Sequence, residues 1–115
     1  MPRILVVDDE PDSLLAARAA LTGAGHDCVL APDGPRALAF LSAGRFDVIV
    51  VDPAMPLHDG WPVLAAAGAT PVVAVTSAPP GLGGRPVAAH LPKPCAADDL
   101  VATVAAVLAD AGAAG

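Results

Sequence analysis

The chain has 115 residues, of which 55% are hydrophobic and only 3% aromatic, and its formal net charge is −6. This length suits a single globular domain that buries about two-thirds of the surface of its unfolded chain. The single lysine and the five arginines are scattered along the sequence. The charge therefore argues against direct, non-specific binding to nucleic acid.

The sequence contains no apolar run close to the length of a membrane span, which needs about 18 uninterrupted apolar residues. Its first ten residues, MPRILVVDDE, place two acids directly after a short apolar run, which is not the pattern of a signal peptide. We therefore expect a cytoplasmic protein with no membrane partner. Cys28 and Cys95 match no metal-ligand spacing, and we expect both to be reduced thiols.

Apolar runs alternate with segments of helical character. We expect strands at residues 4–7, 28–31, 48–51, 72–75 and 87–91. We expect helices at residues 11–24, 35–43, 60–68 and 97–111. The strongest strands are apolar on both faces, which is typical of parallel strands covered by helices. The pattern predicts an α/β fold, a three-layer, doubly wound, five-stranded parallel sheet.

The segment 78–86, APPGLGGRP, does not fit this alternation well. Its prolines and glycines cannot sustain a normal helix. We therefore expect an irregular crossover there, so that the helix that would stand fourth in chain order is short or absent. The final residues, AGAAG, predict a tail or the start of a linker. We place the domain at residues 1–111 and the tail at 112–115.

Polar side chains follow the expected strands at their carboxyl ends, where ligands gather in parallel sheets. In chain order they are Asp8, Asp9, Asp52, Thr76, Ser77, Lys93 and Pro94. Carboxylates without histidine or cysteine make a hard-oxygen site suited to Mg²⁺. A phosphoryl group is the natural anion for a site that combines Mg²⁺, lysine and threonine. A carboxylate is also a competent nucleophile toward phosphorus.

Four motifs at these positions resemble the response-regulator receiver domains of two-component signalling. They are VVDDE at 6–10, VVDPAMPLHDG at 50–60, VTSA at 75–78 and LPKP at 91–94. The resemblance covers essentially the whole chain and implies the flavodoxin-like receiver fold. It also implies that Asp52 is a phosphoacceptor, which takes a phosphoryl group from a phosphohistidine donor and relays the signal by conformational change.

The resemblance further implies the other members of the site. The Mg²⁺ ligands would be Asp8, Asp9, Asp52 and the backbone carbonyl oxygen of Ala54. The phosphoryl group would be bound by Thr76, Lys93 and the backbone N–H of Ser77. The family's Lys-Pro peptide is typically cis, which makes Pro94 the candidate here.

Partners also follow from the resemblance. The donor would be a histidine kinase or a histidine phosphotransfer protein, or a small donor such as acetyl phosphate. The downstream target is not identified by the sequence. The protein would be a monomer or a weak dimer. It would be a signalling domain rather than an enzyme, because it catalyses only its own phosphorylation and dephosphorylation.

Several residues depart from the family pattern. Pro53 has no backbone N–H where the family usually offers a donor, which predicts a weaker or slower acceptor. His90 stands where tyrosine or phenylalanine commonly acts as a rotamer switch coupled to Thr76, so it is either a switch or an ordinary strand residue. Ala54 and Ala78 place no acid, amide or bulk beside the entry for attacking water, and they predict no particular phosphoryl lifetime.

Two other functions remain as alternatives. A pseudo-receiver would be a protein-interaction module that works without phosphorylation, and Pro53 and the segment 78–86 favour it. A small phosphohydrolase of haloacid-dehalogenase type would also use an aspartyl nucleophile. That class needs a second acid two residues after the nucleophile, where this chain has Ala54, so we discount it. We interpret Glu10 as a cap of the first helix.

Overall fold

The computed structural model describes residues 1–53, 60–77 and 87–114. Its strands are β1 (Arg3–Val7), β2 (Asp27–Ala31), β3 (Val48–Val51), β4 (Val72–Thr76) and β5 (Ala89–Pro92). The helices of the described residues are α1 (Pro11–Gly23), α2 (Gly34–Ala43), α3 (Gly60–Ala66) and α4 (Ala97–Ala114). Within this part of the chain, no helix is both long and apolar enough to cross a membrane.

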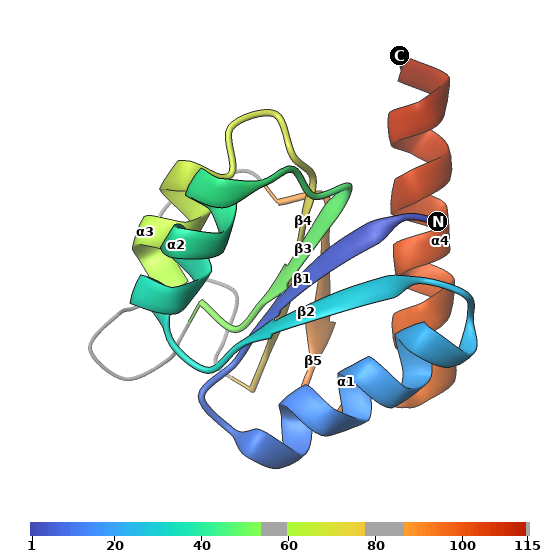
Figure 1. Ribbon diagram of the computed structural model, residues 1–115. Coiled ribbons are helices and arrows are strands. Elements are labelled where there is room, and N and C mark those ends of the chain that lie inside the picture. Colours follow the sequence, from blue (N-terminus) through green and yellow to red (C-terminus); the bar gives the residue numbers. More distant parts are fainter. Residues whose placement is uncertain (54–59, 78–86, 115) are drawn as a thin grey trace.

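The five strands form one parallel sheet in the order β2-β1-β3-β4-β5 (Figure 1). The chain runs outward from β1 to β2, then returns to the other side of β1 to form β3. The order of the strands therefore reverses between β1 and β3. In open parallel sheets this switch point is where ligands bind, beyond the carboxyl ends of the strands.

Helices cover both faces of the sheet, which confirms the predicted three layers (Figure 1). Alternate residues of β1 and β3 face α1 and α4, in a cluster with Leu14, Leu21 and Val104. The other residues of these strands face α2 and α3, in a cluster with Ala37 and Val63. Both faces of the central strands are thus buried, which explains why their sequences are apolar without alternation.

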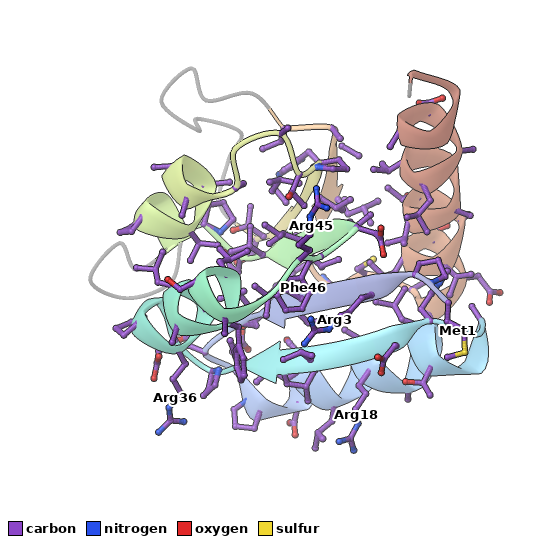
Figure 2. The ribbon with its side chains drawn as sticks, turned by 45° about the horizontal axis from the view of Figure 1, so that its top comes forward. Met1, Arg3, Arg18, Arg36, Arg45 and Phe46 are labelled. Carbon is purple, nitrogen blue, oxygen red and sulfur yellow. The ribbon has the colours of Figure 1, made fainter. Side chains whose placement is uncertain are left out.

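The register of β1 against β3 is supported at the amino end of the sheet. The backbone N–H of Arg3 donates to Oδ2 of Asp47 at 2.7 Å. The Arg3 side chain lies over the ring of Phe46, 4.6 Å from its centroid, and Nη1 donates to the carbonyl oxygen of Arg45 at 3.3 Å (Figure 2). These contacts lie where β1 begins, and Ile4 then pairs with Val48.

Three boundaries differ from the sequence prediction by more than one residue. β5 begins at Ala89 rather than at Val87. Val87 and Ala88 are apolar like the strand itself, but the pairing of β5 with β4 begins only where Ala89 stands opposite Val73. α3 ends at Ala66, two residues before the predicted end, and turn residues 67–69 follow it, among them Gly68 with a φ of 60°.

The third difference is the end of α4, which continues to Ala114 instead of ending at residue 111. Alanine is the strongest helix former, and one glycine in a helix costs only about 1 kcal/mol. The predicted boundary between the domain and a tail after residue 111 stays a prediction. The predicted irregular crossover at 78–86 lies outside the described residues, and the described residues next to it, 77, 87 and 88, are not helical.

Leucines at two positions of α1 allow a matched test of the core. Leu21 is 0% exposed and Leu15 is 50% exposed. We expect Leu21→Ala to lower the free energy of unfolding by about 2–5 kcal/mol, because it removes buried methyl groups and leaves a cavity. Leu15→Ala should change it by no more than about 0.5 kcal/mol. Urea denaturation followed by circular dichroism checks both values, and equal losses would contradict the described packing of α1.

Candidate functional site

Two carboxylates are brought together where β1 and β3 end. Val7 pairs with Val51, so the next residues, Asp8 and Asp52, lie beside each other. The backbone N–H of Asp52 donates to the carbonyl oxygen of Val7 at 3.1 Å. Asp8 is 5% exposed and Asp52 is 7% exposed. Because burying a carboxylate is costly unless it is paired, this edge of the sheet requires a nearby cation.

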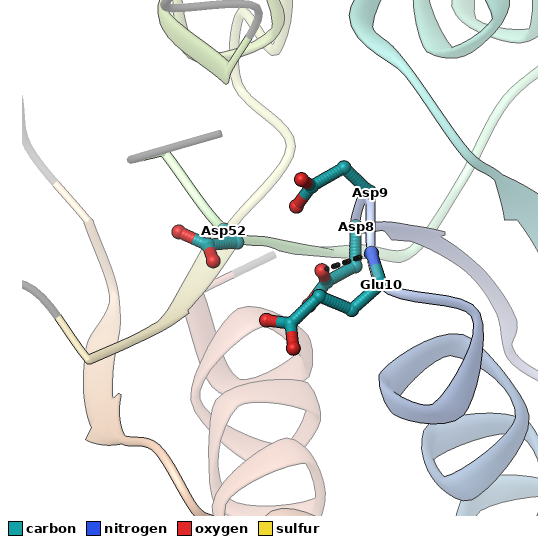
Figure 3. A group of neighbouring side chains, drawn as sticks. All are labelled: Asp8, Asp9, Glu10 and Asp52. Carbon is teal, nitrogen blue, oxygen red and sulfur yellow. Dashed lines mark hydrogen bonds between the residues drawn. The ribbon is translucent and has the colours of Figure 1, made fainter. Parts of the chain in front are cut away.

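Two more acids complete a compact group of carboxylates. Asp8, Asp9, Glu10 and Asp52 each offer one carboxylate oxygen, and these four atoms lie within 4.8 Å of one another (Figure 3). From the sequence, Asp8, Asp9 and Asp52 are the predicted members of this group, and Glu10 is interpreted as a helix cap. Hard oxygen donors gathered in this way match the ligand preference of Mg²⁺.

The cation nearest these carboxylates within the described residues is the Lys93 ammonium. Its Nζ lies 2.6 Å from Oδ2 of Asp8, 2.9 Å from Oε1 of Glu10 and 2.9 Å from Oδ2 of Asp52. The Lys93 side chain is 13% exposed. The backbone N–H of Lys93 donates to the carbonyl oxygen of Thr76 at 3.2 Å, and the Lys93-Pro94 peptide bond is cis, the isomer that the resemblance implied.

The interpretation of Glu10 as a helix cap is corrected by its contacts. Glu10 occupies the N-cap position of α1, but its side chain makes no capping hydrogen bond. It instead accepts a hydrogen bond from Lys93, which is 83 positions away in the sequence. The backbone N–H of Glu10 donates to Oδ1 of Asp8 at 3.0 Å. Three acids in a row after a strand are a sequence signal for such a cluster, but they do not show which acid reaches the lysine.

Burial and ion pairing act in opposite directions on the pKa values of both Asp8 and Lys93. Burial raises the pKa of Asp8 above its ordinary value of 3.8, and hydrogen bonds from Lys93 and from the backbone of Glu10 only partly oppose this. Burial alone would lower the pKa of Lys93, but its hydrogen bonds to three carboxylates outweigh burial and raise that pKa above 10.5. The lysine therefore stays charged at neutral pH, and its ion pairs stabilise the fold until the pH rises through its raised pKa.

A cavity of about 510 Å³ adjoins these charges between α1 and α4. Its lining includes the predicted site residues Asp8, Asp52, Ser77, Lys93 and Pro94. Thr76, the last residue of β4, is 2% exposed and is not part of this lining. Asp9 lies in the carboxylate group but also outside the cavity lining.

Two further predicted residues have defined positions. Pro53 is fully buried directly after Asp52. His90 pairs with Ala74, so it lies on the same face of the sheet as Thr76, two residues farther along β4. The Nε2 atom of His90 is buried and has no hydrogen-bond partner in the part of the chain that the structure describes. The predicted carbonyl ligand of Ala54, and Ala78, lie outside the described residues.

Comparison with known proteins agrees with this geometry. The sequence matches the family described as "Response regulator receiver domain" over residues 4–105. The chain therefore belongs to the response-regulator receiver family, a family of signalling domains in two-component systems. Receiver domains of this family bind Mg²⁺ through an acidic pocket, and the described residues contain a group of four acids at the corresponding edge of the sheet.

Individual relatives extend the comparison. The transcriptional regulatory protein TcrA of Mycobacterium tuberculosis is 36% identical over 91% of this chain and 45% of its own length. The response regulator MprA of Mycolicibacterium vanbaalenii is 35% identical over 92% of this chain and 50% of its own length. The chain thus spans about half the length of these two curated relatives.

Solved structures share the fold. The chemotaxis response regulator CheY4 of Vibrio cholerae is 27% identical, with a TM-score of 0.82 over 93% of this chain and 98% of that one. A CheY-like receiver domain protein of Methanospirillum hungatei has a TM-score of 0.92 over 100% of this chain and 99% of that one. The second protein is 22% identical, so its likeness supports the fold alone.

The raised pKa of Asp8 makes a prediction about stability. Because the folded-state pKa lies above the unfolded value, ionisation of Asp8 destabilises the folded protein as the pH rises through the folded-state pKa. We therefore expect Asp8→Asn to raise the melting temperature at pH 7 without Mg²⁺, because the amide avoids the cost of burying an ionised carboxyl group.

Thermal unfolding at a series of pH values checks this prediction. The advantage of Asp8→Asn should shrink as the pH falls and the wild-type carboxylate becomes protonated. A lower melting temperature for Asp8→Asn at pH 7 would show that the ion pair with Lys93 outweighs the cost of burying Asp8.

Proposed function

We propose that this chain is a phosphoacceptor receiver domain that takes a phosphoryl group from a phosphohistidine onto Asp52. The observation that carries the proposal is the position of Asp52, a 7% exposed carboxylate with the Lys93 ammonium 2.9 Å from its Oδ2. A nucleophilic carboxylate next to a fixed positive charge is suited to attack a negatively charged phosphoryl group. The family membership supports the same conclusion.

The transfer needs one bond to form and one to break. A carboxylate oxygen of Asp52 forms a bond to phosphorus, while the bond between phosphorus and the imidazole nitrogen of the donor breaks. The electron pair of the broken bond stays on that nitrogen, and the product on Asp52 is an acyl phosphate. Lys93 compensates negative charge on the phosphoryl oxygens, and the hydroxyl of Thr76 and the backbone N–H of Ser77 are the proposed hydrogen-bond donors.

The proposed Mg²⁺ ligands are Asp8, Asp9, Asp52 and the carbonyl oxygen of Ala54. The three carboxylates fit a hard divalent cation, because they offer oxygen donors within 4.8 Å of one another. When bound, Mg²⁺ would supply charge neutralisation for the transferring phosphoryl group. Asp8 and Asp52 are held by the ends of neighbouring strands, so the chain itself fixes the spacing of two ligands.

The proposed partners follow from this chemistry. The donor is a histidine kinase or a histidine phosphotransfer protein, and the catalytic role is limited to the domain's own phosphorylation and dephosphorylation. We also propose a cytoplasmic location. The two relatives described above are named as transcriptional regulatory protein and response regulator. The target of this chain is not specified by its residues, and its scattered basic residues do not favour direct contact with nucleic acid.

One observation favours a pseudo-receiver as a second candidate. Pro53 is buried directly after Asp52 and offers no N–H to a phosphoryl oxygen. The loss of one such donor costs on the order of 1–3 kcal/mol. A receiver that is phosphorylated too weakly to signal would act only as a binding module. The retained carboxylates and Lys93 favour phosphorylation over this alternative.

Incubation with acetyl phosphate and Mg²⁺, followed by intact-mass measurement, tests the proposal. We expect the wild type to gain one phosphoryl group, because Asp52 supplies the nucleophile and the neighbouring cations compensate its charge. The gain should fall at least tenfold in Asp52→Asn and in samples without Mg²⁺. If acetyl phosphate and a histidine-phosphorylated donor both fail to modify the wild type, the pseudo-receiver is the better description.

A further inference from the structure

The contacts of the chain's only lysine single out Glu10, for which the family resemblance implied no role. An ammonium group has three N–H donors. The described residues provide three carboxylate acceptors for Lys93, from Asp8, Glu10 and Asp52, at 2.6, 2.9 and 2.9 Å. All three donors of the ammonium are therefore matched by carboxylates.

Two of these acceptors are also proposed metal ligands. Asp8 and Asp52 belong to the carboxylate group whose oxygen atoms lie within 4.8 Å of one another. The Oδ2 atoms of both residues already accept from the Lys93 Nζ. Two cations cannot use the same oxygen atoms at the same position without strong repulsion. A divalent cation that used these Oδ2 atoms would therefore require the ammonium to move away from at least one of them.

Glu10 differs from the other two acceptors in its exposure. Its side chain is 61% exposed, whereas the side chains of Asp8 and Asp52 are 7% and 9% exposed. The backbone of Glu10 is held by its hydrogen bond to Asp8, but its carboxylate lies at the rim of the site. Glu10 thus adds a third bond that holds Lys93 among the buried carboxylates, on the side open to solvent.

We propose that Glu10 is a positioning residue that holds the Lys93 ammonium among the buried carboxylates, so that it competes with binding of a divalent cation. This inference rests on the proposed metal site and extends it. Glu10 acts through Lys93 and is not itself a ligand of the cation. Removing its charge loosens the ammonium and allows Mg²⁺ to displace it more easily.

Glu10→Gln should instead weaken Mg²⁺ binding if Glu10 is itself a ligand of the cation, or if it only adds negative charge near the cation. Its carboxylate belongs to the same group of four acids, and loss of either role would weaken Mg²⁺ binding. Asp12 provides a matched control for the effect of nearby negative charge alone. It is an exposed acid in the first turn of α1 that lines the same cavity, and it is not among the carboxylates that contact Lys93 in the described chain.

The single lysine makes a direct measurement possible. Protein labelled with ¹³C and ¹⁵N only in lysine gives one set of side-chain NMR signals, which belong to Lys93. We would compare the wild type with Glu10→Gln and Asp12→Asn. The first readout is the hydrogen-exchange rate of the ammonium without metal, and the second is the shift of the lysine signals during titration with Mg²⁺. Both variants should fold, since both side chains are exposed.

We expect Glu10→Gln to speed ammonium exchange and to tighten Mg²⁺ binding by about two- to fivefold, the size expected of an ion pair with one exposed partner. Asp12→Asn should leave exchange unchanged and weaken Mg²⁺ binding slightly. Weaker or unchanged Mg²⁺ binding in Glu10→Gln would overturn the inference while leaving the metal site intact. Wild-type lysine signals that do not respond to Mg²⁺ would instead contradict the proposed metal site itself.

Discussion

The site depends on the burial of two carboxylates side by side, which one ammonium makes tolerable. Asp8 and Asp52 are both less than 10% exposed, and the Lys93 Nζ contacts both. Two adjacent buried carboxylates repel each other and lose hydration, so they need a cation. Burial raises the pKa of Asp8, and the hydrogen bond from Lys93 opposes this only in part. Part of the cost of burying the Asp8 carboxylate therefore remains, and binding of a further cation would reduce it.

The fold supplies this arrangement through the pairing of β1 with β3 and of β4 with β5. The contacts of Arg3 with Asp47 and Arg45 lie where β1 and β3 begin, and after four pairs of residues each strand is followed by an aspartate. Lys93 follows β5, two strands away from β3, and reaches the same edge because its backbone is bonded to the end of β4. Packing of α1 and α4 against one face of the sheet keeps the cavity beside these charges.

The strands and the buried acids could be predicted because their signals are local. Strands β1, β3 and β4 are apolar on both faces, and parallel strands deliver the residues after them to one edge. The start of β5 could not be predicted in this way, because residues 87 and 88 are as apolar as the strand and the pairing with β4 begins only at Ala89. The contact between Glu10 and Lys93 joins residues 83 positions apart and depends on side-chain reach, so the local pattern suggested only a helix cap.

Of the four neighbouring carboxylates, we propose that Asp52 is the one that becomes phosphorylated. Reduction of the acyl phosphate with borohydride converts a phosphorylated aspartate into homoserine, which peptide mass spectrometry can locate. After reaction with acetyl phosphate and Mg²⁺, we expect homoserine at position 52 and unchanged Asp8 and Asp9. Reduction at Asp8 or Asp9, with Asp52 unmodified, would contradict it.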